Sequence, residues 1–153
     1  MSNRRMVTIA PTGGTSMKSA NPALPTQPDE IARDVIACHK AGAAIAAIHA
    51  RRPDDLATCN PAIYRDINER IRAGCDIILN NSTGGGNTGD MLVERPDGMF
   101  ENSFEERLKG TEGGAEMCTF DGVTVVDTMS GKDVLVITPP SRCETLVKAM
   151  VDK

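Results

Sequence analysis

Residues 43–49 read Ala-Ala-Ile-Ala-Ala-Ile-His, an almost unbroken apolar run that ends on a polar side chain. Such a run is typical of a strand covered on both faces, as in a parallel sheet, because a strand with one wet face alternates apolar and polar residues. Parallel strands need crossover connections, which are usually helices. The run therefore predicts an α/β fold, with helices on either side of this strand in the sequence.

The segment before this run predicts one strand followed by one helix. Residues 6–10 are rich in β-branched side chains and end at Pro11, which predicts a short strand followed by a turn. Thr26 is placed to cap a helix that continues until Gly42. One strand and one helix therefore precede the central run.

The same unit repeats after the run. Asn60 is placed to cap a second helix, with Pro61 in its first turn and Gly74 at its end. A strand over residues 76–81 follows and runs into a glycine-rich stretch at residues 82–86. Two successive strand-helix units predict crossovers on a parallel sheet.

The second half of the chain is less regular. Residues 87–102 are polar and show no period, which predicts a loop insertion. Ser103 begins a short helix with capping-box spacing, and Ser141 begins a final helix. Three short strands are expected, over residues 117–120, 123–126 and 134–137.

The length limits how much of a closed barrel this pattern can form. The chain has 153 residues, and a complete (β/α)8 barrel needs ~250. We therefore expect one domain over residues 1–153, with about half of the strands and helices of a TIM (β/α)8 barrel.

Composition excludes several classes of partner. The formal net charge is −4 and the pI is about 5.2, which gives no attraction to nucleic-acid phosphates or to an anionic membrane surface. The five cysteines are far apart and form no C-x-x-C pair, and no signal-peptide core precedes Pro11. These features favour a reduced, cytoplasmic protein.

Ligands of α/β folds bind at the carboxyl ends of the parallel strands, so the residues expected there are the candidates for a binding site. Four polar or glycine-rich segments qualify, at residues 12–15, 47–51, 82–86 and 119–122. Ser82 and Thr83 precede three glycines whose backbone N–H groups are approachable, which suits a carboxylate or a phosphate. An ordinary strand-to-loop turn explains the same residues equally well.

His49 ends the central strand and precedes Arg51 by two residues. Because strand side chains alternate, residue 47 shares the face of His49, and a histidine there would complete a metal-chelating H-x-H pair. Position 47 is alanine. From the residues alone, a hydrogen-bonded core histidine is favoured over a metal ligand.

Several motifs together resemble the β-keto acid cleavage enzymes, the family that includes the 3-keto-5-aminohexanoate cleavage enzyme of lysine fermentation. The matching motifs occur in the family's order, at residues 10–14, 22–25, 41–44, 48–51, 54, 60–62, 81–86, 106–108 and 116–122. Residues 87–102 have no match, and residues 134–150 match loosely.

The resemblance implies a TIM barrel that uses zinc and acetyl-CoA to convert a β-keto acid into acetoacetate and a new CoA thioester. It places a metal-binding histidine at His49 and a substrate-binding serine at Ser82. The family's substrate-contacting positions near the fourth strand fall on Thr119 and Asp121. Other expected substrate contacts lie on the neighbouring loops, at Thr15, Arg51, Thr83, Gly84 and Gly85.

Three differences from the family pattern shape the functional prediction. Ala47 replaces the first histidine of the H-x-H pair, and Thr15 replaces an acidic residue that some members carry. The family's late R-x-G-x-E-D segment, which supplies an arginine, a metal-binding glutamate and an aspartate, has no counterpart here. We expect a truncated enzyme that is inactive alone, because catalytic zinc normally takes three protein ligands.

Two alternatives remain. One is a non-catalytic half barrel that associates with itself or with another chain to cover its open sheet edges. The other is an unrelated α/β domain that binds small anions.

Overall fold

The computed structural model of the chain describes residues 5–84, 86–119, 124–127 and 134–152. Its helices are α1 (Pro28–Lys40), α2 (Pro61–Arg72), α3 (Phe104–Lys109) and α4 (Pro140–Val151), with 3-10 turns η1 (Gly89–Met91) and η2 (Gly110–Gly113). Its strands are β1 (Thr8–Ile9), β2 (Ile45–Ile48), β3 (Ile78–Ser82), β4 (Leu92–Glu94), β5 (Phe100–Asn102), β6 (Met117–Thr119), β7 (Thr124–Asp127) and β8 (Val134–Ile137). The described part of the chain contains no helix long and apolar enough to cross a membrane.

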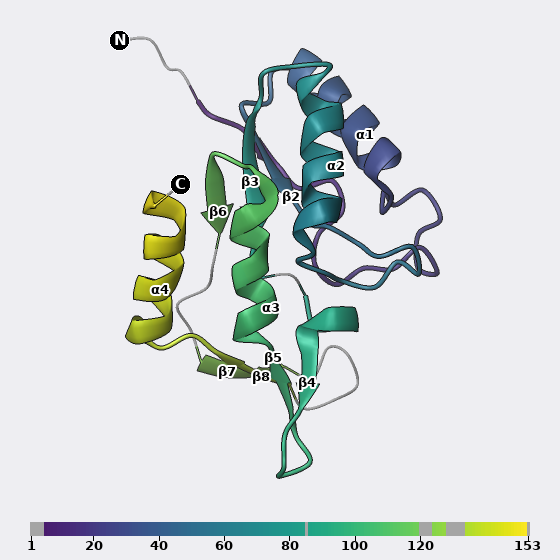
Figure 1. The fold of residues 1–153 in the computed structure, drawn as a ribbon. Helices are drawn as coiled ribbons and strands as arrows, with labels where there is room; N and C mark the ends of the chain where they lie inside the picture. The colour runs from purple at the N-terminus through teal and green to yellow at the C-terminus, as the bar shows by residue number, and fades with distance from the viewer. Residues whose placement is uncertain (1–4, 85, 120–123, 128–133, 153) are drawn as a thin grey trace.

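Four strands form a parallel sheet in the order β1-β2-β3-β6. Helices α1 and α2 pack on one face of it, above the buried side chains of Ala46, Ile48 and Leu79 (Figure 1). The sheet is open rather than closed, because β1 and β6 each have one strand neighbour among the described strands. The α/β prediction is therefore confirmed.

The four predicted helices are present, but α4 begins at Pro140 rather than Ser141, and the cap of α1 also differs. Gln27, not Thr26, is the N-cap, and Glu30 completes a capping box by accepting from the backbone N–H of Gln27 at 3.1 Å. The hydroxyl of Thr26 instead donates to Asp55. A hydrogen bond from Lys18, followed by those from the backbone of Thr26 and Gln27, lowers the pKa of Glu30 to about 2.

The core lies between the two longer helices and the sheet. Ile31 and Val35 of α1 and Ile67 and Ile71 of α2 are fully buried, as their helical spacing predicts. The opposite face of the sheet is more open, and Ile78 and Met117 on it are 40% and 41% exposed. Along each strand, residues that face the core alternate with residues that face the open side. Each strand therefore presents one covered and one open face.

The expectation of a loop insertion at residues 87–102 is wrong in part. Strands β4 and β5 form an antiparallel hairpin there, with Gly98 in the left-handed region (φ +80°) at its turn. Strands of three residues are too short to show a period, so the sequence alone did not predict this hairpin.

Strand β8 lies beside this hairpin rather than in the parallel sheet. The second sheet has the order β4-β5-β8-β7, in which β5 and β8 are parallel and β7 and β8 are antiparallel. It lies at the end of the first sheet toward which β6 points (Figure 1). The carboxyl ends of the parallel strands therefore face a second layer.

Candidate functional site

A cavity of about 240 Å³ lies where the two sheets meet. The parallel sheet and its loops supply most of the lining, and the second sheet supplies Asn102 and Val136. His49 is the titratable side chain among the described lining residues, which are Gly14, Thr15, His49, Ser82, Gly84, Gly86, Asn87, Asn102 and Val136.

Ser82 ends β3 at this cavity, and its backbone is fixed from below. The hydroxyl of Tyr64, a fully buried residue of α2, donates to the Ser82 carbonyl at 2.8 Å. The thiol of Cys59, also fully buried, contacts the same carbonyl at 3.8 Å, and burial raises the pKa of this thiol to about 12. The Ser82 side chain is thus held at the cavity by groups that are themselves packed in the core.

Thr83 serves the fold of the loop and does not line the cavity. Its hydroxyl and its backbone N–H both donate to the carbonyl of Thr119, at 2.6 and 2.9 Å. The guanidinium of Arg107, buried in α3, donates to the Thr83 carbonyl at 2.9 Å. Thr83 therefore joins β3 to β6, and its substrate contact stays a prediction.

Gly86 brings the glycine-rich loop against the loop after β1. Its backbone has φ +99°, and its Cα lies so close to Gly14 that a side chain at position 86 would overlap the Gly14 carbonyl. Only glycine combines this conformation with this approach. Gly84 lines the same cavity, whereas Gly85 lies outside the described residues.

His49 lies at the end of β2 and lines the cavity. Its Nδ1 lies 3.3 Å from the Ala47 carbonyl, which fits an N–H donor at this nitrogen and leaves Nε2 as the basic one. Burial, the largest cause, and the nearby charge of Arg51 lower the pKa of His49. The imidazole is therefore neutral at pH 7, the form that can bind a metal ion.

Arg51 is only 1% exposed and does not line the cavity. Its guanidinium donates to the carbonyls of Gly13 at 2.7 Å and of Ser16 and Asp55 at 3.3 Å. Arg51 thus holds the loop that follows β1 in place. The substrate contact that the resemblance implies for it remains a prediction.

The other predicted site residues are separated. Thr15 is exposed and lines the cavity. Thr119 lies on the open face of the sheet, where its hydroxyl is within hydrogen-bonding distance of both polar atoms of the Asn80 amide, at 2.7 and 3.0 Å. Asp121 lies outside the described residues.

The donor set does not fit a zinc ion. Zinc is held by three or four nitrogen, sulfur or oxygen ligands within about 2.3 Å. Ala47, on the same face as His49, offers a methyl group, and no three His, Cys, Asp or Glu side chains gather within the described ranges. His49 is the one metal-type ligand among the described residues that line the cavity.

Asn102 is a site residue that the sequence analysis missed. From the end of β5 its amide nitrogen donates to the carbonyl of Gly86 and to Oδ1 of Asn87, both at 2.9 Å. It thereby ties the glycine-rich loop to the second sheet. No sequence signal identified it, because it ends a segment without a recognisable period.

A protein family and several curated proteins are similar in sequence to this chain. The beta-keto acid cleavage enzyme family matches residues 4–153. The 3,5-dioxohexanoate:acetyl-CoA acetone transferase of Paraburkholderia graminis is 43% identical over 81 residues, which cover 52% of this chain and 26% of that protein. The 3-keto-5-aminohexanoate cleavage enzyme of Fusobacterium nucleatum is 36% identical over 122 residues, which cover 79% and 40%.

A third relative extends the match along the chain. The 3-dehydrocarnitine:acetyl-CoA trimethylamine transferase of Rhizobium meliloti is 31% identical over 165 residues, covering 98% of this chain and 52% of that protein. The chain thus spans about half the length of these curated relatives, or less. The family match covers nearly every residue and includes the loops that surround the cavity, so the chain belongs to the beta-keto acid cleavage enzyme family.

Proposed function

We propose that the cavity binds the carboxylate and ketone end of a β-keto acid, with acetyl-CoA as the co-substrate of the complete reaction. The carrying observation is the convergence of Ser82, Gly84 and Gly86 on one small cavity in a chain of this family. The backbone N–H of Gly86 donates to the Gly84 carbonyl at 2.7 Å, so the Ser82 hydroxyl is the donor proposed for the carboxylate. The relatives' names, two of which specify acetyl-CoA as a reactant, support the choice of substrate class.

The parallel sheet is, in this proposal, one half of a TIM barrel. Four parallel strands carry helices on one face, and the opposite face is partly exposed. In a closed barrel of eight strands the inward face is filled by side chains from the whole ring. The exposed Ile78 and Met117 fit positions that such a ring would cover.

Binding is tested with 3-oxohexanoate and with hexanoate, which lacks the ketone. We expect the protein to bind 3-oxohexanoate more tightly, and Ser82→Ala to weaken this binding about 10-fold by removing one hydrogen bond to a charged group. Isothermal titration calorimetry measures both constants, and Ser141→Ala, an exposed serine at the start of α4, is the matched control. Equal binding by Ser82→Ala and the unmodified protein would contradict the proposed site.

We further propose that this chain alone holds no catalytic zinc and performs no acyl exchange. One imidazole beside a methyl group offers too few donors for a metal that takes three protein ligands. Zinc would otherwise stabilise the negative charge that develops as the carbon–carbon bond breaks. In this proposal the residues of the cavity bind and orient the substrate, and the carbon–carbon bond is not broken.

Metal analysis of the purified, dialysed protein tests this second part. We expect far less than one zinc per chain, and we expect Ala47→His to add little, because two imidazoles remain an incomplete set. Stoichiometric zinc that disappears in His49→Ala would refute the proposal. Turnover of 3-oxohexanoate with acetyl-CoA by the chain alone would refute it as well.

A second candidate function is that of a non-catalytic half barrel that associates with itself or with another chain. The open edges of β1 and β6 favour it, because unpaired strand edges promote association.

No disulfide joins the five cysteines, all of which the structure describes, and this supports a reducing, cytoplasmic location.

A further inference from the structure

The two edge strands of the parallel sheet run in the same direction. β1 and β6 end the order β1-β2-β3-β6, and every pairing between them is parallel. If β6 of one copy lies beside β1 of a second copy, a twofold axis repeats the contact at the other edge. Two sheets of four strands then close into one ring of eight, the number at which side chains just fill a barrel.

The β1 edge has the features of a strand prepared to pair. The Val7 carbonyl accepts from the N–H groups of Ala44 and Ile45 at 2.9 and 3.2 Å, so it faces β2. Backbone groups of successive strand residues point in opposite directions, and those of Thr8 therefore face the open edge. Met6 and Val7 are 80% and 51% exposed, and Arg5 is exposed as well.

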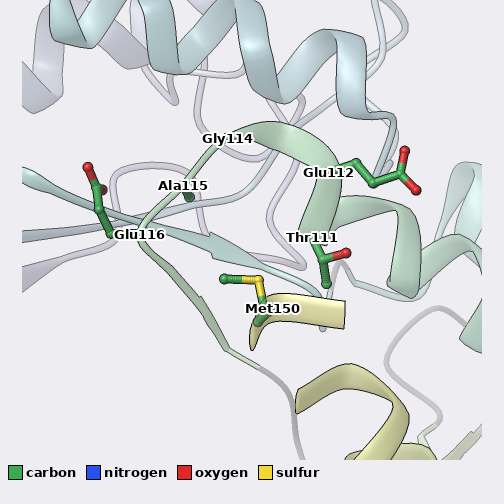
Figure 2. Close-up of a pocket in the computed structure, with 6 residues that line it drawn as sticks. All are labelled: Thr111, Glu112, Gly114, Ala115, Glu116 and Met150. Carbon is green, nitrogen blue, oxygen red and sulfur yellow. The ribbon is translucent and has the colours of Figure 1, made fainter. Parts of the chain in front are cut away.

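The β6 edge offers a matching groove of about 540 Å³, which we call the α4 groove (Figure 2). It lies between the start of β6 and the last turns of α4, which runs beside this strand (Figure 1). Met150 gives it an apolar side, and the carboxylates of Glu112 and Glu116 lie at its opposite ends. Its lining residues are Thr111, Glu112, Gly114, Ala115, Glu116 and Met150.

We propose that the α4 groove and the β6 edge receive residues 5–9 of a second copy of this chain, in parallel with β6. In this arrangement Met6 packs against Met150, and Arg5 lies opposite Glu112, one of the two carboxylates that precede β6. The net charge of −4 on each copy opposes association, so the contact depends on this local pairing of opposite charges. The inference rests on the half barrel proposed above.

The carboxylates differ in what they already bind. Glu116 accepts from the backbone N–H of Leu79 at 2.9 Å and pairs with Arg72, so its loss would disturb the sheet itself. The side chain of Glu112 is exposed on η2. Glu112 is therefore the acidic residue to change in a test of the contact.

The test is the mass of the whole chain in solution, measured by sedimentation or light scattering over a range of concentrations. We expect a species of twice 16.3 kDa. Thr8→Pro removes an N–H that faces the open edge and should weaken the dimer at least about 10-fold, without loss of the β1–β2 hydrogen bonds. Circular dichroism and heat denaturation confirm that the variant is folded.

A charge exchange makes the test specific for these residues. Arg5→Glu and Glu112→Arg should each weaken the dimer about 10-fold, and the double variant should recover most of the loss. Arg33→Glu, on the exposed part of α1, is the matched control and should leave the dimer intact.

Three results would overturn the pairing: a monomer at all concentrations, single reversals without effect, or an open series of larger assemblies in place of a closed dimer. A monomer that still binds 3-oxohexanoate would refute the pairing and leave the proposed binding function standing. A dimer that obeys the charge exchange but binds no β-keto acid would do the reverse.

Discussion

Replacing Gly86 by alanine is expected to cost about 3 kcal/mol of folding free energy and to abolish binding of 3-oxohexanoate. Two independent causes add here. The φ of +99° at position 86 is unfavourable for any residue with a Cβ, and that Cβ would overlap the Gly14 carbonyl. Both obstacles are backbone, which cannot rotate away as the end of a side chain can, so the loop must move as a whole.

Gly14→Ala is the control for this experiment, because it lies on the other side of the same contact. A Cβ at position 14 would meet its nearest neighbours at 3.6 and 3.7 Å, which is ordinary van der Waals contact, and the φ there is not positive. We expect its stability to change by less than about 1 kcal/mol. Urea denaturation measures both variants, and equal stabilities would show that the two loops do not approach as described.

Arg107→Met should be comparably damaging, with a loss of about 3 kcal/mol. The side chain of Arg107 is fully buried, and its guanidinium donates to the Thr83 carbonyl at 2.9 Å and to the Thr138 hydroxyl at 2.7 Å. Methionine keeps most of the length but offers no donor, so both oxygens lose a partner inside the protein. Thr83 follows β3 and Thr138 follows β8, so the loss also weakens the joint between the sheets.

Arg65→Met provides the comparison, because Arg65 is exposed and donates to the Glu112 carbonyl at 3.1 Å. Its expected effect is within about 0.5 kcal/mol. Arg107→Met should also bind 3-oxohexanoate more weakly, since Thr83 adjoins Ser82. Unchanged stability in Arg107→Met would mean that the sheets are held together by other contacts.

The sequence predicts the first half of the fold well because its signals are local. Asn60 accepts from the N–H of Ala62 at 2.9 Å, as a cap followed by Pro61 implies, and Ser103 likewise accepts from Glu106 at 3.2 Å. The apolar run at residues 43–49 contains β2, which pairs in parallel as predicted, but the expected cover on both faces is wrong, because β2 alternates buried and half-buried residues. Each of these features depends on neighbours within a few residues.

The second sheet could not be predicted, because it depends on pairing across distance. β5 joins β8 over an interval of about thirty residues, and nothing within either short strand specifies the other. The same reason hides Asn102 and Val136, which reach the cavity only through that sheet. His49 and Ser82 could be identified because the ends of strands are recognisable in the sequence. Arg51 and Thr83 lie at such ends too, but their side chains donate to the backbone carbonyls of Gly13 and Thr119 and do not line the cavity.

The cavity has its floor in one sheet and its roof in the other, so neither layer alone sets its depth. A ligand that contacts both Ser82 and Val136 would bridge the two sheets, in addition to the hydrogen bond that Asn102 donates to the Gly86 carbonyl. A bound ligand would therefore stabilise the contact between the two sheets.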